Sequence, residues 1–459
     1  MSSAFDPRPA TAAYGSAGSS VAASGSGKGL SSGKGARFEA LFCFLALSTF
    51  LGAYATLPLR LADSDIQGGE SNPFTVASML LVLVGTLAPI AAHWRAVLAV
   101  ARLGGAVNVF VALAVASTLW SYDPAITLRR SLILLQIVLF AYYLVARFPV
   151  EHSLRLLAAV YAVALSLSVL LAVAVPSVGV MHVAELAGAW CGVFEHKSAL
   201  GEACVLGSLC FAWQWAQVPE QRGRYSAAVL LCLALAVMSH SKTAQLTILL
   251  FVPLALYVHI LRSPGLGRIW AAYVSVAVLL ALAAVVFFYF PELTAAVGKD
   301  ETLTGRVPVW KSLVDLALQR PLSGYGYMAF FLAGNPDMEA VWGRGGWTMW
   351  EAHNTTIGIL LELGLPGLAV SAWVLLTIIK RALSVSSADA AAWAGFAAIY
   401  IISYAATSFV EMIMFRPDIH SILVPMFYVA LRQQALRPRP AEVGAAAGPA
   451  YGAARQLQR

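Results

Sequence analysis

TLTGRVPVW (residues 302–310), GYGY (324–327) and EAHNTTIGILLELGLP (351–366) mark the stretch 302–366, which decides the fold of this chain. Most of this stretch is too polar and too rich in Gly to cross a bilayer. Long apolar runs nevertheless border it on both sides. The pattern predicts an extramembrane active-site loop on an integral membrane protein.

The composition of the whole chain agrees with this interpretation. Of the 459 residues, 59% are hydrophobic and 12% are charged, with a mean hydropathy of +0.75, whereas about 25% of the residues of a soluble domain are charged. The alternating segments of a membrane barrel are missing. The five Cys have no CxxC spacing and mostly lie in apolar runs, as small buried hydrophobic residues do. We therefore expect an all-α, polytopic integral membrane protein.

The apolar runs predict about 12 transmembrane helices. They lie at 38–59, 74–92, 103–120, 128–146, 153–175, 198–216, 225–239, 243–261, 270–290, 353–379, 389–409 and 419–432. The tails 1–36 and 433–459 are rich in small and polar residues and are expected to be disordered. Residues 37–432 then form the transmembrane domain.

The distribution of Lys and Arg orients this predicted bundle. With both termini in the cytoplasm, every inner loop carries more than one Lys or Arg, as the positive-inside rule requires. The longest loop, 291–352, then lies on the outer side, together with several further basic residues. A cation near the membrane is costly and usually has a function. The outer face is therefore expected to bind an anion.

Two residues of the long loop are candidates for catalysis. Pro308 suits a first helical turn and apolar residues follow it at helical spacing, which predicts an amphipathic helix with Arg306 at its N-terminus. Free backbone N–H groups at that end suit a phosphate. His353, where the loop re-enters the membrane, could act as a general base.

Both assignments have alternatives. Arg306 could instead pair with Asp300 or Glu301. An interfacial His is often a structural hydrogen-bonding group, and Glu351 could either orient His353 or serve as the base itself.

Other polar clusters gather on the same outer face, and each of them could also be an interfacial anchor or a snorkelling cation. The candidate substrate-binding residues are Arg129, Arg130, His196, Lys197, Lys242, Glu351, Asn354 and Arg416. Arg forms forked hydrogen bonds with phosphate oxygens, and Lys adds a point charge. A lipid-linked pyrophosphate is the ligand that such a set predicts.

Several other chemistries lack their motifs. The chain has no Walker A loop, no HExxH or zinc-like His spacing, and no GxSxG elbow. The net charge of +7 is spread over short loops and the C-terminal tail, so nucleic acid is not an expected partner. A transfer that needs no metal or cofactor and uses a lipid pyrophosphate donor stays open.

With these motifs the chain resembles the superfamily of O-antigen ligases and Wzy-type polysaccharide polymerases over most of residues 100–430. The motifs are TGR with Trp310, GYGY, AHN (352–354) and the following Gly364 and Gly367, preceded by WSYDP (120–124), GVFEHK (192–197) and SHSKT (239–243). The residue types in these motifs are most similar to those of the ExoQ-like exopolysaccharide branch. Lys197-Ser198 departs from the Lys-Asn expected there.

The resemblance implies a GT-C-like fold in the bacterial inner membrane, with 291–352 as a periplasmic catalytic loop. It also implies a metal-independent, inverting glycosyltransferase whose donor is a glycan on undecaprenyl pyrophosphate. Arg306 would stabilise the leaving pyrophosphate, and His353 would accept the proton of the acceptor hydroxyl. The expected partners are the donor, an acceptor glycan and the bilayer, and other polysaccharide assembly proteins are further candidates.

Three functions remain open at this point. The first is a polymerase that joins lipid-linked repeat units into exopolysaccharide or O-antigen. The second is a ligase that transfers the glycan to lipid A–core or to a protein. The third is a transporter of lipid-linked sugars, which would be expected to show charges in mid-span and two repeated halves.

Overall fold

The structure, a computed structural model, describes residues 33–52, 57, 73–182, 186–262, 269–270, 273–274, 306–345, 350–385 and 388–436. Within these ranges the chain is helical and no β-strand forms, which confirms the predicted all-α class. Residues 1–32 and 437–459, most of the expected span 270–290, and residues 291–305 of the long loop lie outside the described residues.

The described helices range in length from single turns to 30 residues. They are α1 (Gly33–Phe50), α3 (Pro73–Ala92), α4 (Trp94–Ala101), α5 (Gly105–Ala116), η1 (Ser117–Leu119), α6 (Pro124–Arg147), α7 (Val150–Ala174), α8 (Pro176–Gly179), α9 (Lys197–Gln217), η3 (Pro219–Gln221), α10 (Arg222–Met238), α11 (Lys242–Arg262), α13 (Arg306–Ala317), α14 (Pro336–Gly345), α15 (Thr355–Ser384), α16 (Ala388–Thr407) and α17 (His420–Ala435).

Four of the described helices are long and apolar enough to cross a membrane: Pro124–Arg147, Val150–Ala174, Thr355–Ser384 and Ala390–Thr407. Two bent pairs raise this number to six if each pair is one span. One pair bends by 98° between Leu80–Ala92 and Trp94–Ala101, and the other bends by 40° before Pro253, whose ring interrupts the helical hydrogen bonding. The expected count of about 12 spans stays a prediction, because only four to six spans are found among the described helices.

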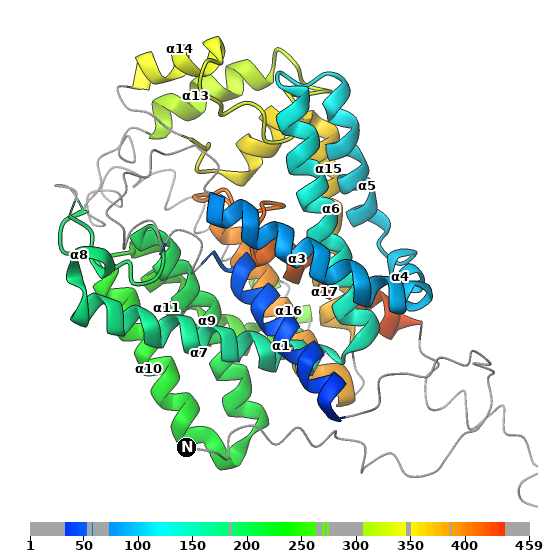
Figure 1. The fold of residues 1–459 in the computed structure, drawn as a ribbon, viewed down its shortest axis with the longest axis vertical. Coiled ribbons are helices and arrows are strands. Elements are labelled where there is room, and N and C mark those ends of the chain that lie inside the picture. Colours follow the sequence, from blue (N-terminus) through cyan, green and yellow to red (C-terminus); the bar gives the residue numbers. More distant parts are fainter. Residues whose placement is uncertain are drawn as a thin grey trace, which may run out of the picture.

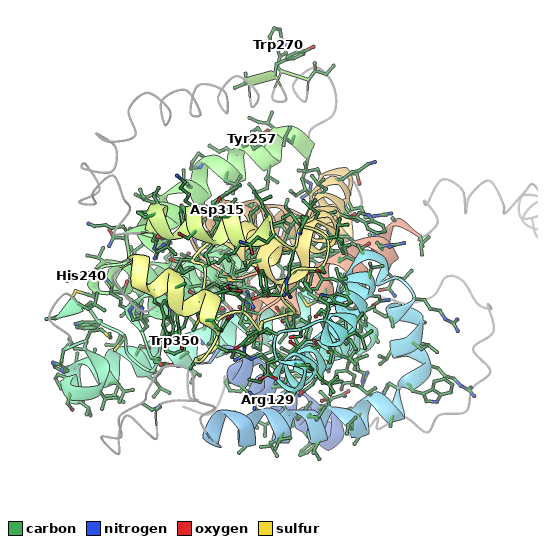
Figure 2. The ribbon with its side chains drawn as sticks, turned by 90° about the horizontal axis from the view of Figure 1, so that it is seen from above. Arg129, His240, Tyr257, Trp270, Asp315 and Trp350 are labelled. Atoms are coloured by element: carbon green, nitrogen blue, oxygen red, sulfur yellow. The ribbon has the colours of Figure 1, made fainter. Side chains whose placement is uncertain are left out.

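The helices divide the molecule into a bundle and a layer across one end of it. Figure 1 shows α13 and α14 lying across the upper end of the bundle, above α15 and α16. Seen from above in Figure 2, Asp315 on α13 and Trp350 both lie over this end. The predicted amphipathic helix is confirmed as α13, whose Val309, Leu313 and Ala317 are buried.

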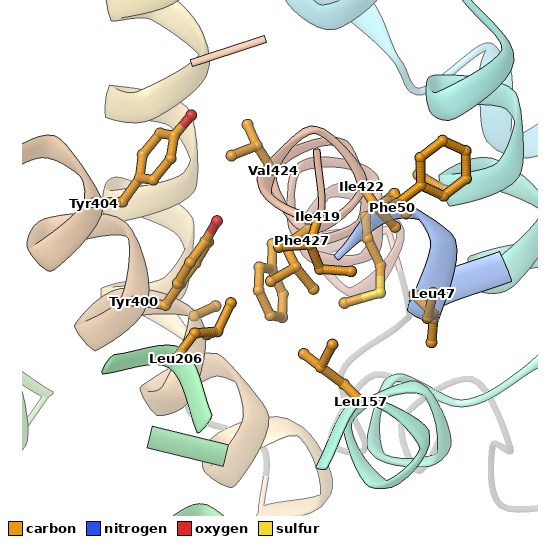
Figure 3. Packing of buried hydrophobic residues seen from close by; sticks show 14 of the residues in the cluster. Leu47, Phe50, Leu157, Leu206, Tyr400, Tyr404, Ile419, Ile422, Val424 and Phe427 are labelled. Carbon is orange, nitrogen blue, oxygen red and sulfur yellow. The ribbon is translucent and has the colours of Figure 1, made fainter. Parts of the chain in front are cut away.

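Helix α17 lies at the centre of the bundle. Every residue of its first three turns, from His420 to Leu431, is buried, as expected for a helix that has neighbours on all sides. Phe427 and Ile422 meet residues of α1, α7, α9 and α16 in the main core (Figure 3). This central position fixes the loop that precedes α17, which forms part of the site described below.

A break in α15 explains two of the Gly-rich motifs. Gly364 has φ 66° and ψ −165° inside this helix, a conformation that costs Gly little and other residues much. The break frees two carbonyl groups, and the N–H groups of Tyr325 and Gly326 donate to those of Leu361 and Glu362, both at 2.9 Å. The GYGY turn is thus a clamp on the broken helix.

The N-terminal end of α6 holds the other side of this turn. The indole N–H of Trp120 donates to the Ser323 carbonyl at 2.8 Å, and the N–H of Tyr122 donates to the Tyr325 carbonyl at 3.0 Å. Asp123 caps α6 by accepting from the N–H of Ile126 at 2.9 Å. The WSYDP motif therefore links α6 to the GYGY turn, which is hydrogen-bonded to α15.

Candidate active site

His353 immediately precedes α15, and its backbone is strained. Its φ of 46° lies in the left-handed region, which is uncommon for residues other than Gly and often marks functional sites. Neighbouring residues hold this conformation. The Ala352 carbonyl accepts from the indole N–H of Trp310 at 2.8 Å, and Asn354 caps α15 by accepting from the N–H of Ile357 at 3.0 Å.

The loop between α16 and α17 fixes the other side of His353. The side-chain amide of Asn354 donates to the Phe409 carbonyl at 2.9 Å. The hydroxyl of Thr355 donates to the Glu411 carbonyl at 2.9 Å and accepts from the N–H of Ile413 at 3.1 Å. These contacts bring Glu411 to the imidazole of His353.

Two carboxylates flank this imidazole. Nδ1 of His353 lies 3.0 Å from Oε1 of Glu351 and 3.7 Å from Oε2 of Glu411. Burial opposes a charge on the ring, but the hydrogen bonds to Glu351 and Glu411 outweigh burial and raise the pKa of His353 to about 9. Most of the imidazole is therefore protonated at neutral pH in the free protein.

The charge on Glu351 is stabilised in return. Burial acts against this charge, but the hydrogen bond with His353 and the positive charges of Arg416 and Arg306 hold the pKa of Glu351 below its usual value. Glu351 thus remains an ionised partner of His353 near neutral pH.

Arg306 is the first residue of α13, as the sequence predicts. Its Nη1 donates to the Val410 carbonyl at 2.9 Å, one residue before Glu411. The alternative partners Asp300 and Glu301 lie outside the described residues. The guanidinium is therefore fixed against the same loop that carries Glu411, with the N–H groups of the first helical turn beside it.

Arg306, Glu351, His353 and Glu411 all line one cavity of about 720 Å³. This volume is within the usual range for small-molecule sites. Helices α9, α11 and α16 form the walls, and apolar side chains such as Leu206, Leu209 and Phe251 line part of them. One opening that combines a cation, a His and two carboxylates with apolar walls suits an amphiphilic anionic substrate.

The remaining candidate residues lie in different places. His196 lines the cavity and caps α9, where its Nδ1 accepts from the N–H of Ser198 at 3.2 Å. Lys197 and Lys242 are the first residues of α9 and α11, and neither is part of the cavity lining. Asn354 is buried and acts on the backbone, as described above.

Arg130 of α6 and Arg416 of the last loop are engaged with protein groups. Arg130 donates through Nη1 to the carbonyl of Met328, next to the GYGY turn. Nη2 of Arg416 lies 2.8 Å from Oε1 of Glu362, and both side chains are largely buried. Arg129 is exposed near the start of α6 (Figure 2). None of the three lines the cavity.

The cavity contains polar residues that the sequence predictions did not include. Glu202, Tyr400, Tyr404, Asp418 and His420 all line it. Glu202 stands inside the apolar run 198–216, and a carboxylate in such a run is itself a signal of function. The two Tyr and His420 gave no comparable signal, because interfacial aromatic residues are common in membrane proteins.

Glu351, His353 and Glu411 also have the composition of a metal site. Their ligand atoms lie within 4.8 Å of one another. Carboxylate and imidazole are ordinary ligands of Zn²⁺ and Mn²⁺. However, the hydrogen bonds between these groups account for the same arrangement without an ion.

Comparison with known proteins agrees with the resemblance drawn from the motifs. Residues 227–372, which include Arg306 and His353, match the family model Wzy_C, described as O-Antigen ligase. Over 291 residues the chain is 28% identical to "Exopolysaccharide production protein ExoQ" of Rhizobium meliloti (strain 1021), and this match covers 60% of the chain and 65% of that relative. These findings confirm the similarity to the O-antigen ligase and Wzy superfamily, on its ExoQ-like branch, and indicate a bacterial membrane protein.

Proposed function

We propose that this protein is a membrane glycosyltransferase that polymerises undecaprenyl-pyrophosphate-linked repeat units into exopolysaccharide or O-antigen. The observation that carries the proposal is the convergence of Arg306 and the Glu351–His353–Glu411 cluster on one cavity with apolar walls. The similarity to an exopolysaccharide production protein supports the same class of product.

In the proposed reaction, a hydroxyl oxygen of the acceptor sugar attacks the anomeric carbon of the donor. The bond between that carbon and the pyrophosphate oxygen breaks, and the configuration at the carbon inverts. Arg306 and the N–H groups at the start of α13 stabilise the charge that develops on the leaving pyrophosphate. This stabilisation supplies what a metal ion supplies in other transferases, so we propose a metal-independent transfer.

His353 is the proposed acceptor of the hydroxyl proton. Only the neutral imidazole can take this proton, and the pKa of about 9 makes that form a minority at neutral pH. Glu351 and Glu411 stabilise the imidazolium that results, in the way a carboxylate supports a general-base His. If His353 instead stays charged throughout, one of these carboxylates is the base.

The membrane arrangement is part of the proposal. We place both termini in the cytoplasm, about 12 spans within residues 37–432, and the catalytic loop 291–352 on the periplasmic side of the inner membrane, as in GT-C-like transferases. The four apolar helices and two bent pairs support a polytopic chain.

Reconstitution tests this function directly. The full chain in liposomes, supplied with a purified undecaprenyl-pyrophosphate-linked repeat unit and no ATP or divalent metal, is expected to produce longer chains and to release undecaprenyl pyrophosphate. R306Q and H353Q are expected to abolish elongation while preserving expression. Full turnover by H353Q would refute the role of His353.

A ligase is the second candidate, because the family model that matches residues 227–372 is described as O-Antigen ligase. Donor and chemistry are the same, and only the acceptor differs. Deletion of the gene separates the two. Loss of the polymer supports a polymerase, whereas polymer that accumulates on undecaprenyl pyrophosphate supports a ligase.

A further inference from the structure

The cavity continues beyond the proposed catalytic groups along α9 and α16. Its α9 lining extends from His196 to Leu209, and its α16 lining extends from Thr407 to Tyr400. At a rise of about 1.5 Å per residue, Tyr400 lies about 10 Å along α16 from Thr407. We call this part, lined by Glu202, Tyr400, Ser403, Tyr404, Asp418 and His420, the inner compartment.

A hydrogen-bonded chain forms one side of the inner compartment. The Tyr400 hydroxyl and Nδ1 of His420 are 2.8 Å apart, and Nε2 of His420 lies 2.6 Å from Oε1 of Glu202. His420 is almost fully buried, whereas 42% of the Glu202 side chain is accessible. These hydrogen bonds therefore hold the carboxylate of Glu202 in a fixed position at the cavity.

Tyr404 adds a buried hydroxyl group to the inner compartment. The side chain is 3% exposed, and its hydroxyl finds no hydrogen-bond partner among the described residues. Tyr400 and Tyr404 are one turn apart on α16, with ring centroids 5.7 Å apart, and their hydroxyls point the same way in Figure 3. A buried hydroxyl without a partner is costly, so this one is suited to a ligand.

The two ends of the cavity differ in whether they carry an Arg side chain. Arg306 is the one Lys or Arg among the described lining residues, and it lies at the end that carries His353. Glu202 and Asp418 lie in the inner compartment, where a pyrophosphate would meet carboxylates and no Lys or Arg among the described lining residues. A neutral ligand rich in hydroxyl groups suits that place, because carboxylates accept from hydroxyls and tyrosines donate to them.

From these observations we propose that the inner compartment is a saccharide-binding subsite, in which Glu202 and Tyr404 bind the hydroxyl groups of a neutral sugar. The aromatic rings of Tyr400 and Tyr404 provide flat apolar surfaces for the C–H faces of such a ring. The inference rests on the proposed glycosyl transfer, and we assign the sugar to the acceptor.

Equilibrium binding tests the subsite without relying on turnover. The detergent-solubilised full chain is titrated with free glucose, galactose, mannose and their disaccharides, and saturation-transfer NMR reports binding. Y404F removes one hydroxyl that has no partner among the described residues, so its unfolding temperature is expected to stay the same or to rise. Its affinity for the best sugar is expected to fall about 5-fold, the effect of one hydrogen bond. E202Q is expected to reduce the affinity by at least as much.

Two controls separate the subsite from the rest of the site. Y122F changes a Tyr whose hydroxyl donates to the Gly334 carbonyl outside the cavity, and it is expected to bind sugars as the wild type does. R306Q is expected to weaken farnesyl pyrophosphate binding and leave the sugar signal unchanged. No sugar signal in the wild type, or an equal affinity in Y404F, would overturn the proposal even if the protein polymerises lipid-linked units.

A third probe identifies the source of the sugar. The best sugar linked to farnesyl pyrophosphate imitates the donor. If this compound leaves the signal of the free sugar in place, the subsite belongs to the acceptor, as we expect. Displacement of the free sugar would overturn the acceptor assignment and give the subsite to the donor. Failure of the reconstituted wild type to elongate chains would instead contradict the proposed function.

Discussion

The indole N–H of Trp310 donates to the carbonyl of Ala352 at 2.8 Å, and this bond joins α13 to the residue before His353. Because Arg306 begins the same helix, the bond also links the two residues to which we assign catalysis. Trp310 is therefore a positioning residue: it contacts no reacting atom but fixes the distance between Arg306 and His353.

Replacement of Trp310 tests this link. W310F keeps the apolar ring and loses the donor, so it is expected to lower kcat about 10- to 100-fold through misplacement of His353, with KM for the lipid-linked unit nearly unchanged. Steady-state kinetics in liposomes measure both constants. W373F, at an exposed position on α15, is the matched control. An unchanged kcat in W310F would show that the bond has no positioning role.

The raised pKa of His353 predicts an alkaline rise in activity. If the neutral imidazole is the base, kcat/KM increases with pH, reaches half of its maximum near pH 9 and levels off above that pH. E351Q removes the partner that raises this pKa most, so the rise is expected to shift to lower pH. A rate that falls through pH 9 would show that the charged imidazolium is required, and the base would then be Glu351 or Glu411.

The same shift predicts how stability depends on pH. The pKa of His353 in the folded state lies above the ordinary value of about 6.5. Protonated His353 therefore stabilises the folded state fully below pH 6.5, and this stabilisation is lost as the pH rises through about 9. The wild type is expected to lose on the order of 2 kcal/mol relative to H353Q between pH 6 and pH 9.5. Denaturant unfolding in detergent at several pH values measures the difference. If the free energies of unfolding of the wild type and H353Q changed equally with pH, the raised pKa of His353 would be contradicted.

The clamp between the GYGY turn and α15 leaves no space for an added methyl group. A Cβ at Gly324 would lie 2.4 Å from the Glu362 carbonyl, and both Gly324 and Gly364 have positive φ. G324A is therefore expected to reduce the unfolding temperature and the activity together. G343A, in α14, meets nothing within 4 Å and is expected to be neutral. Equal thermal unfolding of the two variants would contradict the role of the clamp.

Removal of metal tests the proposed mechanism against the alternative that Glu351, His353 and Glu411 hold an ion. Elongation is expected to continue at the same rate in EDTA, because Arg306 and α13 stabilise the leaving group. Loss of activity in EDTA, restored by Zn²⁺ or Mn²⁺ in the wild type and not in E411Q, would assign the cluster to a metal.

The sequence predicted the parts of this molecule that depend on local pattern. The all-α class, the helix that begins at Arg306 and the position of His353 before a long apolar helix all follow from periodicity and composition. The contacts between these residues and distant parts of the chain do not follow from such patterns. Glu411 reaches His353 through contacts of Asn354 and Thr355 with a loop some 55 residues later, and no local pattern records such contacts.

The sequence predictions included some residues that lie outside the cavity and missed others that line it. Arg130 and Arg416 carry the charges expected of phosphate ligands, yet tertiary structure engages them with the Met328 carbonyl and with Glu362. Tyr404 and His420 look like ordinary interfacial aromatic residues, yet the crossing of α16 and α17 brings them into the cavity. Charge in the sequence therefore identified only some of the residues that line the cavity.

The position of His353 depends on contacts of its neighbours with two other segments of the chain. Its neighbours are anchored by Trp310 on one side and by residues 408–413 on the other, and α17 must be in place to support that loop. The proposed site therefore depends on contacts between segments some 55 residues apart in the chain. The proposed reaction centre is complete only when α17, the last of the described helices, has entered the bundle.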